Sequence, residues 1–232
     1  MSSSVVVPTA LAGAGRAHIL FILDRSGSMA GSEADVIGGF NTLIGTLRAE
    51  PGLPPCDVSV TRFDTEIETF WRELPLAKVP AMTPRHFVPR GSTALLDAVG
   101  ITLSTIESIA EDRYLCVIHT DGHENASREW TAERVKDLIA RLEALGNWSF
   151  AFFGADTDAW ETAARDYGVA MSAAAPIGKK EQRAHYAAEA RVLALMQRRS
   201  ARSSRGMGSA VRAVMDNPEL SEEQIEELLD QR

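Results

Sequence analysis

Apolar runs that end abruptly in polar residues set the layout of this chain. Residues 19–23 are all apolar and lead directly into Asp24, and the apolar run 114–118 leads into His119-Thr120-Asp121. A third, mostly apolar run covers 148–153 and ends at Gly154. Short saturated runs of this kind are typical of parallel strands covered on both faces. The pattern therefore predicts buried strands with a polar loop at each carboxyl end.

Helical periodicity occupies the segments between these strands. Apolar residues recur at helical spacing over 33–47, from Leu95 to about Ala110, over 131–145 and over 160–167. The runs 56–63 and 67–76 instead favour an antiparallel hairpin, because only Asp64-Thr65-Glu66 separates them. A last short strand is expected within 169–176. The alternation predicts an α/β fold: a Rossmann-like, doubly wound, mostly parallel sheet with one antiparallel edge strand and helices on both faces.

The two ends of the chain differ in composition from the part between them. Residues 1–16 are expected to form a flexible N-terminus, because they are small, interrupted by Pro8 and lack the basic region of a signal peptide. The domain is expected to cover 17–199, including a docked helix at 187–196. Residues 200–232 are expected to be a linker followed by a short acidic amphipathic helix, which begins at the capping-box signature Ser221-x-x-Gln224.

Composition and charge narrow the function classes. With 232 residues and 45% hydrophobic content, the chain can bury one sizeable core. It has 24 Lys and Arg against 32 Asp and Glu, a net charge of -8, which disfavours binding to nucleic acid or to an anionic membrane. Cys56 and Cys116 each lie in an apolar run, and no apolar run reaches membrane-spanning length. These features predict a cytoplasmic protein without a disulfide framework.

Oxygen-bearing side chains gather where the predicted strands end. Asp24, Ser26 and Ser28 alternate in one loop, so they can present three hard oxygen donors toward a single point. Thr93 precedes a predicted helix, and Asp121 follows a predicted strand. Such donors suit Mg²⁺, Mn²⁺ or Ca²⁺ and suit zinc poorly. Taken singly, each residue also has an ordinary structural interpretation: a turn pair for Asp24 and Ser26, a helix N-cap for Thr93, and a turn acid for Asp121.

The motifs Asp24-x-Ser26-x-Ser28, Thr93 and Thr120-Asp121-Gly122 occur in an order that makes residues 17–177 resemble a von Willebrand factor type A domain of the bacterial cytoplasmic or phage type. The resemblance implies a metal-ion-dependent adhesion site that holds Mg²⁺, with Mn²⁺ or Ca²⁺ as alternatives. It implies that Ser26, Ser28 and Thr93 offer hydroxyls to the cation. Asp24 and Asp121 would act mainly through water or hydrogen bonds. The family uses this site to bind an Asp or Glu of a partner, so a non-enzymatic protein-binding module is expected.

Two other functions compete with this one. The first is a hydrolase that uses Ser26 or Ser28 as nucleophile or uses the metal to activate water, although no G-x-S-x-G elbow occurs. The second is a self-regulated assembly protein whose acidic tail occupies its own or a neighbour's metal site. The acids concerned are Glu222, Glu223, Glu226 and Glu227.

Several neighbouring residues have no settled role from the sequence. For Asp97, the sequence favours two interpretations equally: it orients the metal site, or it is an ordinary helix cap. Glu124 and Asn125 match a TDGxEN variant of the family motif but receive no ligand role. His119 is expected to point into the sheet core rather than to pair with His123 on zinc.

Overall fold

The computed structural model of the chain describes residues 15–49, 53–121, 124–154, 174–176, 187–189, 191–193, 195 and 207–230. The strands are β1 (Ala17–Asp24), β2 (Cys56–Phe63), β3 (Ile67–Pro75), β4 (Arg113–Thr120), β5 (Trp148–Gly154) and β6 (Ala174–Pro176). The helices are α1 (Glu33–Ala49), α2 (Leu95–Ser104), α3 (Ala132–Ala144), α6 (Met207–Asp216) and α7 (Glu222–Leu229), with 3-10 turns η1 (Gly27–Met29) and η2 (Leu76–Lys78). Residues 187–189, 191–193 and 195 are also helical. The predicted N-terminal segment 1–14 and helix 160–167 lie outside the described residues.

One six-stranded sheet organises the molecule, in the order β3-β2-β1-β4-β5-β6. All neighbouring pairs are parallel except β2 with β3, which form the antiparallel hairpin at the edge. The predicted fold class is therefore confirmed. Because the chain passes from β1 to β2 on one side and later enters β4 on the other, the direction of winding reverses between β1 and β4. In sheets of this kind, ligands bind at the carboxyl ends of the strands beside that switch point.

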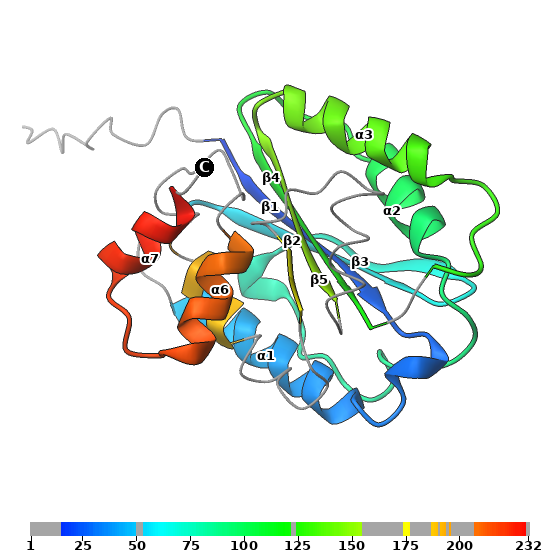
Figure 1. The fold of residues 1–232 in the computed structure, drawn as a ribbon, viewed down its shortest axis with the longest axis horizontal. Helices are drawn as coiled ribbons and strands as arrows, with labels where there is room; N and C mark the ends of the chain where they lie inside the picture. The colour runs from blue at the N-terminus through cyan, green and yellow to red at the C-terminus, as the bar shows by residue number, and fades with distance from the viewer. Residues whose placement is uncertain are drawn as a thin grey trace, which may run out of the picture.

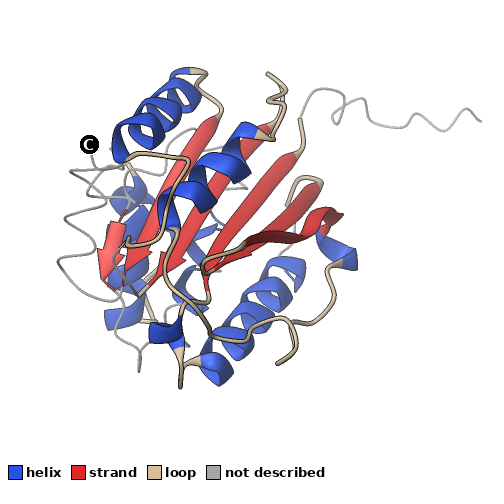
Figure 2. Cartoon of the chain, turned by 90° about the vertical axis from the view of Figure 1, so that its right-hand side faces the viewer, coloured by secondary structure: helices blue, strands red, loops and turns tan. Residues whose placement is uncertain are grey.

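Helices cover both faces of the sheet, as Figures 1 and 2 show. Alternate residues of β1 enter different cores: Phe21 packs with α1, α6 and α7, whereas Ile22 packs with α2 and α3. This double burial explains why the β1 sequence lacks polar alternation. A docked helix was expected at 187–196, and in the described part of that range Val192 and Leu193 are fully buried in the first of these cores.

The helix expected to run to about Ala110 ends earlier, at Ser104. The Ser104 and Thr105 hydroxyls donate to the carbonyls three residues before them, an alternative to continuing the helix. Beyond Ser104, side chains from later in the sequence form hydrogen bonds with the backbone N–H and carbonyl of Ile109. The Tyr114 hydroxyl accepts from its N–H at 3.0 Å, and Asn147 Nδ2 donates to its carbonyl at 2.9 Å. Apolar residues continue at helical spacing beyond Ser104, which is why a longer helix was expected. The long-range bonds to Ile109 instead favour an irregular connection.

The C-terminal part of the chain packs against the sheet rather than hanging free. Helix α6 begins at Met207, within the segment expected to be a linker. Helix α7 begins with the predicted capping box, in which Ser221 and Gln224 each accept a backbone N–H from the other. Ile225 is fully buried in the same core as α1. No helix within the described ranges is both long and apolar enough to span a membrane.

Candidate metal centre

The five predicted site residues come together at the carboxyl edge of the sheet, beside the β1–β4 switch point. Asp24 is the last residue of β1, and the loop after it carries Ser26 and Ser28, the latter in η1. Asp121 directly follows β4, the parallel neighbour of β1. Thr93 comes from a third segment, two residues before α2 begins. Residues almost 100 positions apart therefore share one edge because the strands that carry them are parallel.

Hydrogen bonds directly join the loop after β1 to the carboxyl end of β4 and the residue after it. Asp24 Oδ1 accepts the Ser26 N–H at 2.6 Å, and Asp24 Oδ2 accepts the Thr120 hydroxyl at 2.5 Å. Ser28 Oγ donates to Asp121 Oδ1 at 2.6 Å and lies 3.0 Å from Ser26 Oγ. The two acids thus fix the loop that carries the two serine hydroxyls. That Asp24 and Asp121 support a bound metal ion stays a prediction.

Thr93 is held by its backbone, while its hydroxyl makes no hydrogen bond within the described residues. Its N–H donates to Asn125 Oδ1 at 2.9 Å, and its carbonyl accepts the Asn125 N–H at 3.0 Å. The residue is only 3% exposed. The N-cap of α2 is Ala94, so the interpretation of Thr93 as an N-cap is wrong. A hydroxyl on a fixed, largely buried residue, with no hydrogen-bond partner among the described residues, is suited to act as a ligand.

Electrostatics at this edge favour a bound cation. Asp24 is 1% exposed, and its burial raises the pKa of the carboxyl group. The hydrogen bonds from Thr120 and Ser26 act in the opposite direction, whereas the nearby charge of Asp121 raises the pKa of Asp24 further. A positive ion beside the Asp24 carboxyl group would favour its ionised form.

The donor set fits a hard divalent cation. The candidate ligands are hydroxyl and carboxylate oxygens, which Mg²⁺ prefers, and Mg²⁺ readily keeps water for the remaining positions. Within the described ranges, this edge of the sheet included, no group of three or more His, Cys, Asp and Glu residues is arranged to hold a metal ion, so the candidate centre depends on its hydroxyl oxygens. When bound, such an ion would supply a Lewis-acidic centre for an incoming carboxylate oxygen. Ser26, Ser28 and Thr93 are the residues that would hold it.

Glu124 and Asn125 have positioning roles that the sequence did not reveal. Glu124 Oε2 accepts the Leu96 N–H at 2.9 Å and therefore caps the first turn of α2 from another loop. Its Oε1 accepts the N–H groups of Ala126 and Ser127 at 2.9 and 2.7 Å. Together with the Asn125 bonds to Thr93, these contacts fix the start of α2 against the loop after β4. The only signal in the sequence was the match to the TDGxEN variant.

Asp97 does not cap a helix, which was one of the two roles considered from the sequence. Its Oδ2 accepts the Arg128 N–H at 2.7 Å, and its Oδ1 accepts the N–H groups of Glu129 and Trp130 at 2.9 and 2.7 Å. It therefore organises the connection between β4 and α3. Within the described residues, the hydrogen bonds of its carboxylate reach none of the five candidate residues, so any influence on them passes through the backbone of α2.

His119 points into the interior, as expected. Its side chain is 9% exposed and packs against Phe153, with ring centroids 5.2 Å apart. Its Nε2 lies 3.3 Å from Oε2 of Glu189, which is fully buried in the helical segment 187–195. The residue thus connects β4 to that helix. His123, the other member of the histidine pair, lies outside the described residues.

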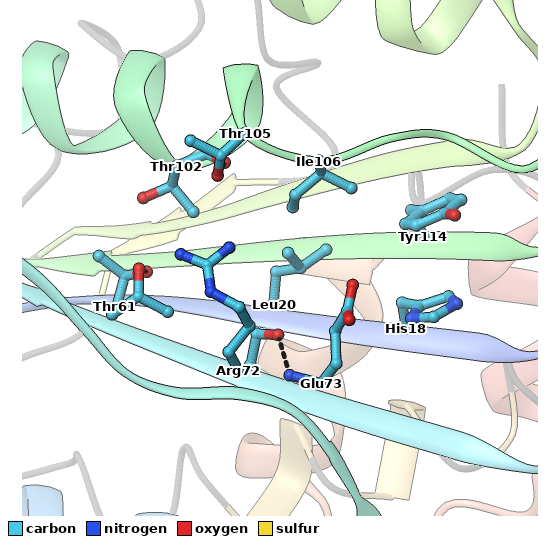
Figure 3. A pocket seen from close by; sticks show the side chains of 11 residues that line it. His18, Leu20, Thr61, Arg72, Glu73, Thr102, Thr105, Ile106 and Tyr114 are labelled. Atoms are coloured by element: carbon cyan, nitrogen blue, oxygen red, sulfur yellow. Dashed lines mark hydrogen bonds between the residues drawn. The ribbon is translucent and has the colours of Figure 1, made fainter.

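A second hollow lies on the α2 face of the sheet, toward the amino ends of β1 and β4 (Figure 3). Its lining includes His18, Thr61, Arg72, Thr102 and Tyr114. The enclosed space is about 20 Å³, which is enough for about one water molecule and not for a larger ligand. The candidate metal centre therefore remains the main site of interest.

Comparisons with known proteins support the fold. No protein-family model matches the chain, and no curated protein sequence matches it significantly. Among solved structures, proximal thread matrix protein 1 from the mussel byssus matches with a TM-score of 0.53 at 15% identity, over 73% of this chain and 44% of the other. A von Willebrand factor type A protein from Catenulispora acidiphila gives 0.52 at 13%, over 83% and 43%.

A third match is the ArnB paralog VWA2 from Sulfolobus acidocaldarius, with a TM-score of 0.52 at 15% identity, over 76% of this chain and 45% of the other. The chain thus spans less than half the length of each of these proteins. Identities this low establish the fold alone. The described chain has the fold of a von Willebrand factor type A domain, and its candidate metal centre lies at the carboxyl edge of that fold's sheet.

Proposed function

We propose that this chain is a divalent-cation-dependent protein-binding module that recognises an Asp or Glu side chain of a partner protein. The observation that carries the proposal is the convergence of three loops. Two serine hydroxyls on the loop held by Asp24 and Asp121 share one edge with the Thr93 hydroxyl, which makes no hydrogen bond to any described residue. A cation held mainly by neutral hydroxyls remains electrophilic. A carboxylate from a partner can then complete its coordination shell.

Mg²⁺ is the proposed ion, with Mn²⁺ and Ca²⁺ as alternatives. Mg²⁺ requires octahedral oxygen geometry and retains water easily, so it suits a site in which Asp24 and Asp121 act through water or hydrogen bonds. Zinc prefers nitrogen and sulfur ligands. Those ligand types are absent from the five candidate side chains, which favours a hard cation.

A hydrolase is less well supported than a binding module. The hydroxyl of Ser28 donates to Asp121, and that of Ser26 lies beside Ser28. Within the described residues, neither serine has a hydrogen bond to a histidine that could act as general base. A lone Mg²⁺ is also a weak generator of hydroxide.

Occupation of the site by the chain's own tail is also less well supported. Helix α7 lies near the amino end of β1, whereas η1 lies beyond its carboxyl end (Figure 1). For Glu222 or Glu226 to reach Ser28 of the same molecule, α7 would have to leave the core in which Ile225 is buried. A separate partner protein, or the tail of a neighbouring molecule, imposes no such cost.

Buried cysteines support a cytoplasmic location for the module. Cys56 and Cys116 are both buried free thiols, and burial raises the pKa of Cys56 to about 12. A thiol that stays protonated is a poor nucleophile for disulfide exchange. The cytoplasmic setting remains part of the proposal, as does a bacterial or phage origin.

Direct titration with Mg²⁺ tests the ion-binding step. Isothermal calorimetry should detect one site in the wild type and a loss of at least about tenfold in affinity for Thr93→Val. Thr102→Val is the matched control, because Thr102 is a buried threonine of α2 whose hydroxyl likewise has no partner in the described residues. Absence of Mg²⁺, Mn²⁺ and Ca²⁺ binding by the wild type would refute the proposal.

Partner recognition needs its own experiment. The immobilised protein should retain specific host proteins in Mg²⁺ and release them in EDTA, and Asp24→Ala should retain none of them. Replacing the acidic residues of a captured partner one at a time should identify a single Asp or Glu whose loss abolishes binding. Retention that is indifferent to EDTA and to Asp24→Ala would contradict the proposed mode of recognition.

A further inference from the structure

A fourth loop contacts two loops of the candidate metal centre. It is the turn of the β2–β3 hairpin, in which Asp64 is 1% exposed. Asp64 closes the turn with its neighbour: its N–H donates to the Glu66 carbonyl at 3.0 Å, and its Oδ1 accepts the Glu66 N–H at 2.7 Å. The Asp64 carbonyl accepts the N–H of Ala94, the residue after Thr93, at 3.0 Å. The hairpin turn therefore contacts the Thr93 loop directly.

The Asp64 carboxylate joins an arginine from each of two site loops. Its Oδ2 lies 2.8 Å from Nε of Arg25, which stands between Asp24 and Ser26. The same oxygen lies 2.8 Å from Nε of Arg90, three residues before Thr93. The backbone N–H of Arg90 also donates to the Arg25 carbonyl at 2.9 Å. One buried oxygen thus holds both loops.

Apart from Asp64, the guanidinium of Arg25 has only one carboxylate of the described residues near it to balance its charge. It is 4% exposed, and the other carboxylate paired with it, that of Glu68, is 3.8 Å from its Nη1. A buried guanidinium without a close counter-charge is strongly unfavourable, so removal of the Asp64 charge would push Arg25 to a new position. Because Arg25 is bonded within the Asp24–Ser28 loop, such a movement would also displace the serine hydroxyls.

The Thr93 hydroxyl is sensitive to the same network. Since that hydroxyl makes no hydrogen bond within the described residues, its position depends on the backbone around it. That backbone is held on one side by Asn125 and on the other by the Asp64–Ala94 and Asp64–Arg90 contacts. Asp64 therefore influences the separation between Thr93 and the two serines.

We propose that Asp64 is a positioning residue of the metal centre: it sets the spacing between the loop of Ser26 and the loop of Thr93 without touching the ion. The inference rests on the proposed cation-binding function. It assigns a role to a hairpin-turn residue that lies outside the three sequence motifs.

The test compares Asp64→Asn with a matched control at the other end of the same strand. Asp57 is also a buried acid, 7% exposed, and binds the guanidinium of Arg16 through two contacts of 2.6 and 2.7 Å. Both substitutions remove the ion pair of a buried acid, although the Arg16 partner of Asp57 is half exposed, so both should lower thermal stability. Mg²⁺ affinity by calorimetry should fall at least about tenfold for Asp64→Asn and stay within about twofold of wild type for Asp57→Asn.

The outcomes separate the inference from the function on which it rests. No ion binding by the wild type would overturn the proposed function. Wild-type affinity in folded Asp64→Asn, with clear binding by the wild type, would overturn only the positioning role. An equal loss of affinity in both variants would also overturn it, because a general loss of stability would then explain the effect.

A milder substitution keeps the inference testable if Asp64→Asn does not fold. Arg90 is half exposed in its side chain, so Arg90→Gln should fold while releasing the Thr93 loop from the Asp64 carboxylate. We expect a partial loss of Mg²⁺ affinity of about threefold to tenfold, which Arg90→Lys should in part restore. Unchanged affinity in Arg90→Gln would contradict the positioning role of the network.

Discussion

The hydroxyl of Ser28 donates to the carboxylate of Asp121 at 2.6 Å, across 93 positions of sequence. This bond links the loop after β1 to the loop after β4, the two central strands between which the winding of the sheet reverses. Because Ser28 is exposed and Asp121 lies at the strand end, the pair marks the point where the candidate metal centre meets solvent.

Ser28→Ala should affect stability in a way that depends on the ion. Without divalent ions the variant loses the hydrogen bond to Asp121 and the contact with the Ser26 hydroxyl, each worth about 1 kcal/mol. With Mg²⁺ present, the wild type gains additional stability through binding, whereas the variant gains less. Thermal unfolding at increasing Mg²⁺ concentration should therefore widen the difference in melting temperature. A difference that is constant over the titration would indicate that Ser28 is not a ligand.

Asp97→Asn should lower stability without weakening ion binding. The amide group replaces one of two oxygens that together accept three backbone N–H groups, so at least one donor loses its partner, at a cost of about 1–3 kcal/mol. Urea unfolding measures this loss. Mg²⁺ affinity should remain within about twofold of wild type, since the contacts of Asp97 lie in the β4–α3 connection. A selective loss of affinity would instead favour the metal-orienting role.

Gly100→Ala should be strongly destabilising because α2 packs closely against Trp130. A Cβ atom at position 100 would lie 2.0 Å from the Trp130 ring, so the ring or the helix must move. We expect a loss of about 1–3 kcal/mol in the free energy of unfolding. Gly45→Ala in α1 is the control, since no atom lies within 4 Å of its Cβ position. That change should stabilise the protein by about 0.5–1 kcal/mol.

Acid should weaken a cluster at the amino end of the sheet, where Asp112 accepts the Arg16 N–H at 2.8 Å and lies 3.0 Å from His18 Nε2. Burial by itself raises the pKa of Asp112, but the bonds from His18 and Arg16 outweigh it and hold the pKa below its ordinary 3.8. A carboxyl group of this kind stabilises the fold above its unfolded pKa and loses that contribution as the pH falls through its folded pKa.

The stability difference between wild type and Asp112→Asn should accordingly be largest near neutral pH. It should amount to about 1–3 kcal/mol there and shrink as the pH falls below 3.8. Urea unfolding of both proteins at pH 7, 4 and 3 measures the trend. An equal difference at all three values would show that ionisation of Asp112 contributes nothing.

Ile225→Ala should destabilise the whole domain, although α7 lies near the end of the chain. Ile225 is fully buried in the core shared with α1 and β1, and truncations of this kind cost about 2–5 kcal/mol. Glu223→Ala is the control, because Glu223 is exposed on the same helix. Fluorescence of the core tryptophan Trp71 should report a single transition that shifts only in Ile225→Ala. An unshifted transition would mean that α7 unfolds separately.

Motifs and periodicity were sufficient for the main features of the fold and of the site. The carboxyl ends of parallel strands meet at one edge of the sheet. Because Asp24 and Asp121 each follow an apolar run, their proximity could be predicted from the sequence. The hairpin 56–63 and 67–76 was also predictable, because its turn is short. Helix α3 was placed to within a residue at each end, since its apolar face repeats without interruption and Thr131 caps it.

Other features depended on contacts that leave no periodic signal. The end of α2 is decided by Tyr114 and Asn147, which lie farther along the chain. The roles of Asp64 and Glu124 arise because their carboxylates accept donors from other loops. Helix α6 lies close to a Ser-, Arg- and Gly-rich segment whose composition is typical of a linker, and it is stabilised by the burial of Val211 against the sheet. These helix boundaries and side-chain roles are determined by tertiary packing rather than by local sequence.

Helix α7 lies away from the candidate metal centre, which is useful for experiments with the protein immobilised on a solid support. Glu223 is exposed on α7, which lies away from the carboxyl end of β1 (Figure 1). A protein anchored to a sensor chip through a cysteine introduced by Glu223→Cys would present its candidate binding edge outward. Since Cys56 and Cys116 are buried, coupling at that position would be selective. The fold thus provides an oriented probe in which a captured partner and the solid support do not compete for the same face.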